Sequence, residues 1–266
     1  MGYILKAYLE KSVGMRKKFL FASFIVSVLS LISVHPAVAQ NQKSYVIGVE
    51  DLEYYPLWRY DASLKEYRGL GRKLLDAFAK SKGYTFEYKP LPIKRLVREL
   101  VDKKIDFKFP DSPYWANDVK GNAEITYSEP AIKFTDGVFV KPENMGKGDA
   151  SIKTLGSVLG FTPWDWLERI QKKEVILKET PDFGALINQA ISDRIDGAYA
   201  NTEVVRYHLD MEGRQGALVF DKGLPHVEGN YTLSTTLHPD VIKEFNDWLA
   251  NNQALISRLR KEMNIR

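Results

Sequence analysis

The sequence predicts an α/β protein made of two similar lobes. A β-α-β pattern occupies residues 45–91, where a β-branched run, an amphipathic helix and a second strand follow one another. The same pattern restarts after residue 150, at a spacing of 90 residues. Between the two lies a Gly- and Pro-containing stretch at 141–149 with the composition of a linker. Two β-α-β-α-β lobes joined by a linker account for all three observations.

The first 39 residues indicate a signal peptide rather than a part of the fold. A basic start at 15–18 precedes an apolar run at 19–34, and Ala37-Val38-Ala39 before Gln40 is a small-residue cleavage site. A membrane anchor is the alternative, but the apolar run is short for a span and a cleavage site follows it directly. We therefore expect export to the periplasm and a soluble mature protein that begins at Gln40.

The charge balance of the expected mature chain excludes one class of partner. Residues 1–39 carry five of the 38 Lys and Arg and one of the 34 Asp and Glu, so equal numbers of each remain after cleavage. No surplus of positive charge is left to drive nucleic-acid or membrane binding. The chain has no cysteine, so it forms no disulfide and carries no lipid-modified cysteine.

The first lobe begins with the strand at 45–49, followed by an aromatic loop. Leu70, Leu74, Leu75 and Phe78 recur at helical spacing, and Gly83 is placed to end that helix. The remaining elements that the pattern predicts are a strand at 85–88, a helix at 93–103, a third strand at 105–109 ended by Pro110, and a strand at 136–140.

The second lobe repeats this order. Its predicted elements are a strand at 158–161, a helix to about residue 171, a strand at 174–178, a helix at 183–192 and a strand at 195–200. Lys104-Ile105-Asp106 matches Arg194-Ile195-Asp196, each between a helix and a strand, so we expect Asp106 and Asp196 to close the same turn in both lobes.

The C-terminal part is expected to return to the first lobe. It contains extended runs at 216–220 and 230–234 and two helices, one beginning at Pro239 and one around Leu255. Its return gives two strands that connect the lobes and act as a hinge. The predicted boundaries are 40–137 for the first part of lobe 1, 138–225 for lobe 2 and 226–266 for the return to lobe 1.

In order and spacing, a series of short segments resembles the extracellular solute-binding proteins of family 3, the amino-acid type. These segments are Ile47-Gly48-Val49-Glu50, Tyr55-Pro56, Gly69-Leu70-Gly71, Pro92 with Arg95, Lys104-Ile105-Asp106, Tyr127-Ser128-Glu129-Pro130, Arg194-Ile195-Asp196-Gly197 and Glu244-Phe245-Asn246. The resemblance implies a type II periplasmic-binding-protein fold with the ligand cleft between the lobes. It also implies closure on the ligand and delivery to an ABC importer.

The sequence departs from this family at two positions that would hold an α-amino acid. The family places an Arg shortly before the Tyr-Ser pair, but residues 117–122 contain none, and Lys120 is the nearest cation. Where the family has an Asp for the α-ammonium group, this chain has Asn201. We therefore expect ordinary α-amino acids to bind weakly, unless Lys120, Arg95 or Arg206 compensates.

Neither a cofactor nor a metal is expected. Gly69-Leu70-Gly71 lacks the third glycine of a dinucleotide fingerprint and favours a tight start to a helix. His208, His226 and His238 do not have metal-ligand spacing. No nucleophile elbow or Cys/His pair exists. The sequence predicts a binding protein, and a periplasmic lyase or dehydratase stays open as the alternative because of scattered carboxylates.

Ligand contacts are expected from the loops that follow strands, because ligands of open α/β sheets bind at the carboxyl ends of strands. For the aromatic candidates the alternative is a packed core or hinge position. Aromatic rings and acids favour a small polar or cationic organic ligand held by stacking and hydrogen bonds. The expected partner is an importer permease or a membrane sensor, and the protein is expected to be a monomer. The candidates are Asp51, Tyr54, Trp58, Arg95, Asp111, Ser112, Tyr114, Trp115, Phe161, Thr162, Trp164, Asn201 and Thr202.

Overall fold

The computed structural model describes residues 43–265. The chain divides into two units, 1–40 and 41–266, and all described residues belong to the second. The predicted signal peptide, 1–39, lies outside the described residues. Within 43–265, none of the helices has the length and apolar character needed to cross a membrane.

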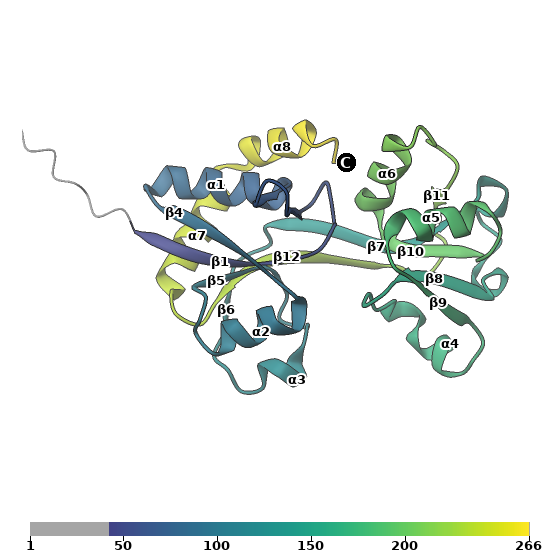
Figure 1. Ribbon diagram of the computed structural model, residues 1–266, viewed down its shortest axis with the longest axis horizontal. Coiled ribbons are helices and arrows are strands. Elements are labelled where there is room, and N and C mark those ends of the chain that lie inside the picture. The colour runs from purple at the N-terminus through teal and green to yellow at the C-terminus, as the bar shows by residue number, and fades with distance from the viewer. Residues whose placement is uncertain (1–42, 266) are drawn as a thin grey trace, which may run out of the picture. The chain divides into compact units, whose positions relative to one another are not determined.

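The first lobe is built on a parallel sheet in which β1 (Ser44–Glu50) lies between β4 (Thr85–Leu91) and β5 (Phe107–Asp111) (Figure 1). The helix between β1 and β4 is α1 (Leu70–Lys82), and the helix between β4 and β5 is α2 (Ile93–Val101). Gly83 ends α1 with φ 70°, in the left-handed region that glycine adopts without strain. The predicted β-α-β unit is therefore confirmed.

The second lobe repeats this arrangement, with β8 (Thr154–Val158) between β9 (Ile176–Thr180) and β10 (Gly197–Asn201), again parallel. Its helices are α4 (Leu167–Gln171), α5 (Phe183–Ile191) and α6 (Thr202–Met211). The two lobes also share a packing detail. A Cβ on Gly48 of β1 would lie 2.4 Å from Ile105 Cδ1, and a Cβ on Gly156 of β8 would lie 2.4 Å from Ile195 Cδ1.

Two long strands connect the lobes, as predicted. β7 (Ile132–Val140) and β12 (Val227–Thr235) pair antiparallel from Tyr231↔Ile132 to Val227↔Asp136. Beyond that ladder β12 pairs with β5 and with β6 (Thr126–Tyr127), while β7 pairs with β10 and with β11 (Val219–Phe220). The strand order β4-β1-β5-β12-β7-β10-β8-β9 therefore runs through both lobes.

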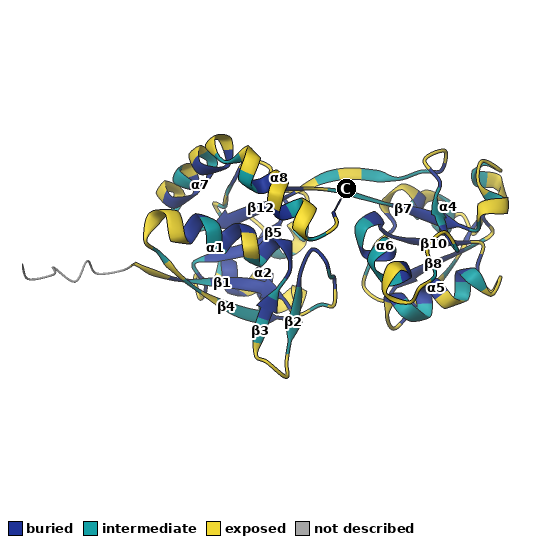
Figure 2. Ribbon diagram, turned by 90° about the horizontal axis from the view of Figure 1, so that it is seen from above, coloured by how far each residue is buried: buried dark blue, intermediate teal, exposed yellow. Residues whose placement is uncertain are grey.

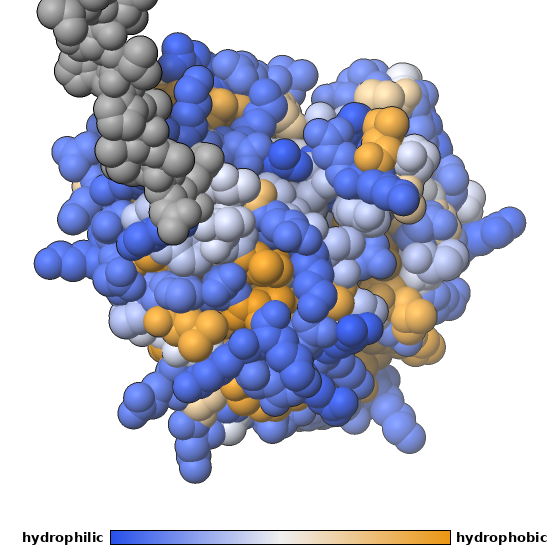
Figure 3. All heavy atoms as spheres, turned by 60° about the vertical axis from the view of Figure 1, so that its left-hand side comes forward, coloured by the Kyte–Doolittle hydropathy of each residue, from blue (hydrophilic) through white to orange (hydrophobic). Residues whose placement is uncertain are grey.

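The C-terminal helices pack against the first lobe. They are α7 (Pro239–Asn251) and α8 (Gln253–Glu262). Phe245 of α7 contacts Phe78 of α1, with ring centroids 5.0 Å apart. Figure 2 shows buried residues along the strands and exposed residues on the outer sides of the helices. Figure 3 shows hydrophobic residues, in orange, near the middle of one face, with hydrophilic residues around them.

Three element predictions were wrong. The first strand of lobe 2 ends at Val158 rather than beginning there, and Gly160 turns the chain with φ 90°. Pro110 does not end β5, which continues to Asp111. Pro110 lies at a register shift in the pairing with β12, so the absence of its N–H removes no hydrogen bond between the two strands. The aromatic loop contains an unpredicted hairpin, β2 (Arg59–Asp61) with β3 (Glu66–Arg68).

The remaining short elements are α3 (Asn117–Lys120) and three 3₁₀ turns. The turns are Pro142–Asn144, Asp149–Ser151 and Trp164–Trp166. The last of these carries a predicted site residue, Trp164, in the segment between β8 and α4.

Candidate functional site

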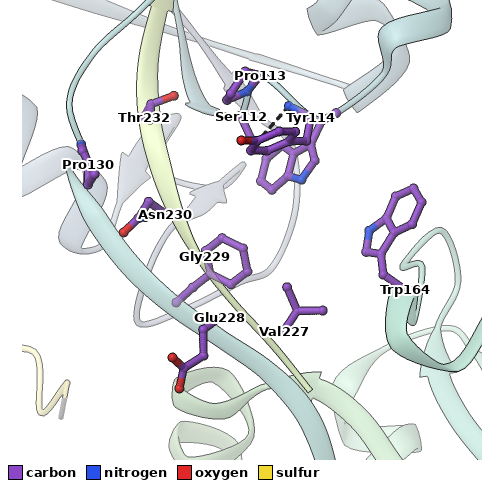
Figure 4. Close-up of a pocket in the computed structure, with 12 residues that line it drawn as sticks. Ser112, Pro113, Tyr114, Pro130, Trp164, Val227, Glu228, Gly229, Asn230 and Thr232 are labelled. Atoms are coloured by element: carbon purple, nitrogen blue, oxygen red, sulfur yellow. Dashed lines mark hydrogen bonds between the residues drawn. The ribbon is translucent and has the colours of Figure 1, made fainter. Parts of the chain in front are cut away.

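A pocket of about 540 Å³ lies between the loop that follows β5, the connecting strands and Trp164 of the second lobe (Figure 4). Figure 4 shows Trp164 across the pocket from Tyr114, and Glu228 and Asn230 turned away from Trp164. No Lys or Arg is among the lining residues. The lining consists of Ser112, Pro113, Tyr114, Trp115, Pro130, Phe134, Trp164, Val227, Glu228, Gly229, Asn230 and Thr232.

The rings of this pocket differ in how tightly they are packed. Tyr114 and Trp164 are 82% and 57% exposed, so both are free to contact a ligand. Phe134 stacks on the buried Tyr231 with ring centroids 4.3 Å apart, and Trp115 meets Tyr231 edge-on at 5.8 Å. The pocket therefore has a fixed aromatic floor and two exposed aromatic walls.

Three predicted site residues, Tyr54, Trp58 and Phe161, come together next to this floor. Tyr54, from the loop after β1, stacks on Phe161, from the loop after β8, at 5.3 Å. Trp58 contacts both Tyr54 at 4.8 Å and Tyr231 at 4.9 Å. Tyr54 and Trp58 are buried. These rings connect the lobes by packing against one another, so in this conformation they fill space rather than line it.

A buried charge cluster lies beneath the loop after β5. Asp111 Oδ1 lies 3.0 Å from Lys108 Nζ and 3.0 Å from Lys120 Nζ, and Ser234 Oγ donates to Asp111 Oδ2 at 2.7 Å. Burial would raise the pKa of Asp111, but the two ammonium groups hold it below its usual range. Burial lowers the pKa of Lys120, an effect that Asp111 opposes. Lys120 is thus committed to Asp111, and Asp111 has little capacity left for a ligand.

Glu50, at the end of β1, is a second buried acid of this region. Burial raises its pKa to about 7, with part of the effect offset by Lys108 and a smaller upward contribution from Asp111. In the sequence Glu50 drew attention only as one of the scattered carboxylates.

Asp136, on β7, is a half-buried acid that sequence reasoning missed. Its Oδ1 accepts a hydrogen bond from Asn201 Nδ2 at 2.9 Å, while Asn201 Oδ1 caps α6 by accepting from the Glu203 N–H at 3.0 Å. Burial raises the pKa of Asp136 to about 7, against the opposing effect of the hydrogen bond from the Asn201 amide. Within 43–265, no Lys, Arg or His forms an ion pair with Asp136.

The other predicted residues lie apart from the pocket or at its edge. Asp51 and Thr162 are exposed and do not line it. Arg95 is exposed, with its Nε 2.9 Å from Glu99 Oε1. Thr202 is buried as the first residue of α6. The ligand roles of all thirteen candidates stay predictions.

The residues that the sequence did not single out are those inside strands. Phe134, Asp136 and Tyr231 belong to β7 and β12, where alternating apolar residues are typical of core positions. An acid inside such a strand was the one available signal for Asp136.

Gly69 has a structural reason to be glycine. It lies at the start of α1 with φ 111°, and a Cβ there would be 2.6 Å from the Leu57 carbonyl oxygen. Among residues 43–265 no group of three or more His, Cys, Asp or Glu side chains is arranged to hold a metal ion.

The sequence matches no protein-family model and no curated protein. Solved structures do match in fold. The GluR0 ligand-binding core in complex with L-glutamate has a TM-score of 0.66 and 15% identity, over 84% of this chain and 99% of that one. A substrate-binding protein of an ABC uptake transporter from Streptococcus pneumoniae, with bound histidine, has a TM-score of 0.63 and 19% identity, over 83% of this chain and 92% of that one.

A third likeness is to the ancestral amino-acid-binding protein AncCDT-1, a precursor of cyclohexadienyl dehydratase. Its TM-score is 0.59 at 16% identity, over 83% of this chain and 95% of that one. These matches cover both lobes and the connecting strands, and the protein therefore has the two-lobed type II periplasmic-binding fold.

Proposed function

We propose that this protein is a periplasmic solute-binding protein that captures a small polar organic ligand between its lobes and presents it to an ABC importer. The observation that carries the proposal is the pocket of about 540 Å³, to which lobe 1 contributes Tyr114 and lobe 2 contributes Trp164. A pocket shared by two lobes that are joined by two strands is suited to capture by closure. The likeness to the Streptococcus pneumoniae substrate-binding protein supports the same function.

Export and partner choice belong to this proposal. The signal-peptide pattern at 1–39 supports export to the periplasm, and the proposed partner there is an importer permease. A membrane sensor is the alternative partner. Deleting the permease gene adjacent to this gene, if one is present, and measuring ligand uptake separates the two, since only an importer partner is needed for uptake.

The first experiment is a thermal-shift screen of purified mature protein with amino acids, amines, small peptides, sugars and organic acids. A ligand at a thousand times its dissociation constant stabilises the folded state by about 4 kcal/mol, which is a readily measured shift. Small-angle X-ray scattering with each hit then tests for closure, with a smaller radius of gyration expected. Hits that leave the radius unchanged would speak against capture by closure.

Ordinary α-amino acids are expected to be weak ligands. Lys120 is paired with Asp111, and Asn201 is engaged by Asp136 and by the start of α6, so neither of the family's two charged anchors is replaced at its own position. A hydrogen bond to a charged group is worth about 1.5–3 kcal/mol, so the loss of both weakens binding by roughly two to four decades. Micromolar binding of a common α-amino acid would contradict this.

A lyase or dehydratase is the second candidate function. The likeness to AncCDT-1, a precursor of a dehydratase, favours it, as do Glu50 and Asp136, whose raised pKa values suit proton transfer near neutral pH. Turnover of a metabolite by sub-stoichiometric protein, lost in both Glu50→Gln and Asp136→Asn, would establish an enzyme.

A further inference from the structure

The carboxylate of Asp136 lacks a counter-charge among the described residues, and it lies beside the pocket rather than in its lining. Its hydrogen-bond partner is the neutral Asn201 amide, at 2.9 Å. It lies on the same face of β7 as Phe134, two residues earlier, and its cross-strand neighbour on β12 is Val227. Both Phe134 and Val227 line the pocket. A carboxylate that is partly removed from water loses hydration unless a cation replaces it, so such groups are usually paired.

The lysines of this region are already balanced by other acids. Lys108 and Lys120 both pair with Asp111 at 3.0 Å, and Glu50 is the second carboxylate close to Lys108. The pocket lining itself contributes no Lys or Arg. The site therefore has no cation left for an anionic ligand, whereas two carboxylates of the described residues, Asp136 and the exposed Glu228 of the lining, have no ion-pair partner.

The groups around Asp136 are also suited to a cation. Tyr54 is 1% exposed, and its hydroxyl lies close to that of the buried Tyr231. It lies close enough to Asp136 for the carboxylate charge to raise the pKa of the phenol further than burial alone does. Tyr114 and Trp164 present exposed ring faces, which attract organic cations through the negative charge density of their π systems.

We propose that the ligand of this pocket is an organic cation whose charged group pairs with Asp136 and whose remaining surface contacts Tyr114 and Trp164. This proposal rests on the proposed function, because it names the class of ligand for the same cleft. It moves the contact for positive charge from Asn201, where the resemblance puts it, to the neighbouring strand residue Asp136.

Three nearly isosteric probes test the sign of the recognised charge. Benzamidine is a cation, benzamide is neutral and benzoate is an anion, and all three share one planar ring. Isothermal titration calorimetry of the mature protein is expected to give benzamidine an affinity about 10- to 100-fold higher than benzamide, the range for one hydrogen bond to a charged group. Benzoate is expected to bind more weakly than benzamide. Choline and its neutral isostere 3,3-dimethylbutan-1-ol repeat the comparison for a quaternary ammonium group.

Asp136→Asn and Glu129→Gln form a matched pair of variants. Each removes one carboxylate charge near the pocket, but Glu129 is exposed and is not among the lining residues. Asp136→Asn is expected to abolish the preference for benzamidine over benzamide. Glu129→Gln is expected to change the preference less than about 3-fold, as for an exposed and screened charge. Circular dichroism of each variant checks that the fold is retained.

Substitutions of Trp164 test how much the aromatic ring contributes to benzamidine affinity. Because it is 57% exposed, its replacement does not disturb the core. Trp164→Phe keeps an aromatic face and is expected to retain most of the benzamidine affinity, whereas Trp164→Leu keeps apolar area and is expected to lose about 3- to 10-fold.

The outcomes separate this proposal from the proposed function. Equal affinities for benzamidine and benzamide, a preference for benzoate, or a cation preference that survives in Asp136→Asn overturns the cation proposal. Absence of benzamidine and choline binding at about 1 mM overturns it as well. If another class of molecule then binds in the broad screen and reduces the radius of gyration, the solute-binding function stands without it.

Discussion

Asp106 and Asp196 hold the same position in the two halves of the chain, 90 residues apart. Asp106 Oδ2 accepts a hydrogen bond from the Val46 N–H at 2.7 Å, and Asp196 Oδ2 accepts one from the Thr154 N–H at 2.7 Å. Each carboxylate thus fixes the start of the first strand of its lobe, β1 or β8. The sequence repeat predicted a shared turn, and the structure gives it a shared hydrogen bond.

Replacing either aspartate is expected to destabilise the protein. Asp196→Ala leaves the Thr154 and Lys153 amides, at 2.7 and 2.9 Å, without their acceptor. A cost of about 1–3 kcal/mol in unfolding free energy follows for a lost charged acceptor. Urea denaturation measures it, and Asp247→Ala, at an exposed helix position, serves as control. An equal effect of both substitutions would contradict the structural role.

The buried Asp111 is expected to matter far more than any surface acid. Asp111→Asn removes the ion-pair partner that Lys108 and Lys120, both buried, share. Removing one member of a buried ion pair typically costs about 3–5 kcal/mol. The control is Asp102→Asn, because Asp102 pairs with Lys104 at an exposed site where such a pair contributes about 0–1 kcal/mol. If the two variants had the same denaturation midpoint, the role of the Asp111 cluster in stability would be refuted.

Stability should fall as pH rises through the weakly acidic range because of Glu50 and Asp136. Burial raises the pKa of both to about 7, whereas unfolded carboxyl groups titrate near 4. Between these values the folded protein binds more protons than the unfolded chain, so each group lowers the unfolding free energy by about 1.4 kcal/mol per pH unit. Above about pH 7 this loss is complete.

The difference between the wild-type protein and Asp136→Asn isolates one of these groups. The variant is expected to be more stable than the wild-type protein at pH 8 and to show a smaller decline between pH 5 and 7. Glu228→Gln should keep the wild-type slope. Parallel pH profiles for Asp136→Asn and the wild-type protein would show that Asp136 titrates at an ordinary pKa.

The stack of Tyr54 on Phe161 is expected to hold the lobes together without ligand. Phe161→Ala removes a ring that contacts Tyr54 at 5.3 Å and Phe183 at 5.9 Å. We expect the ligand-free variant to have a larger radius of gyration in X-ray scattering than the wild-type protein. Leu159→Ala, two residues earlier and 67% exposed, is the control and should change nothing. An unchanged radius in Phe161→Ala would mean that the stack does not restrain the lobes.

The order of elements and the two-lobed fold could be predicted because hydrophobic periodicity and the repeat report on local structure and burial. The ends of strands were harder to predict from the sequence. The composition of the Leu159-Gly160-Phe161 run is that of a strand, yet it forms the turn after β8. Among site residues, Tyr54 and Trp164 stood out as aromatics in loops. Asp136 and Tyr231 did not stand out. Their contacts are between strands that are distant in sequence, and a local sequence pattern does not report on such contacts.

The antiparallel ladder between β7 and β12 limits how the two lobes can move. From residue 132 to 136 each residue of β7 is in register with a residue of β12, so neither strand can slide past the other without breaking backbone hydrogen bonds. The ladder can still bend and twist, because those deformations leave its hydrogen bonds in place. Within the proposed function, opening is therefore a rotation about a short, fixed axis and not a free separation. The proposed closure would return Trp164 to the same position opposite Tyr114 each time, so the geometry of the pocket would be reproduced from one capture to the next.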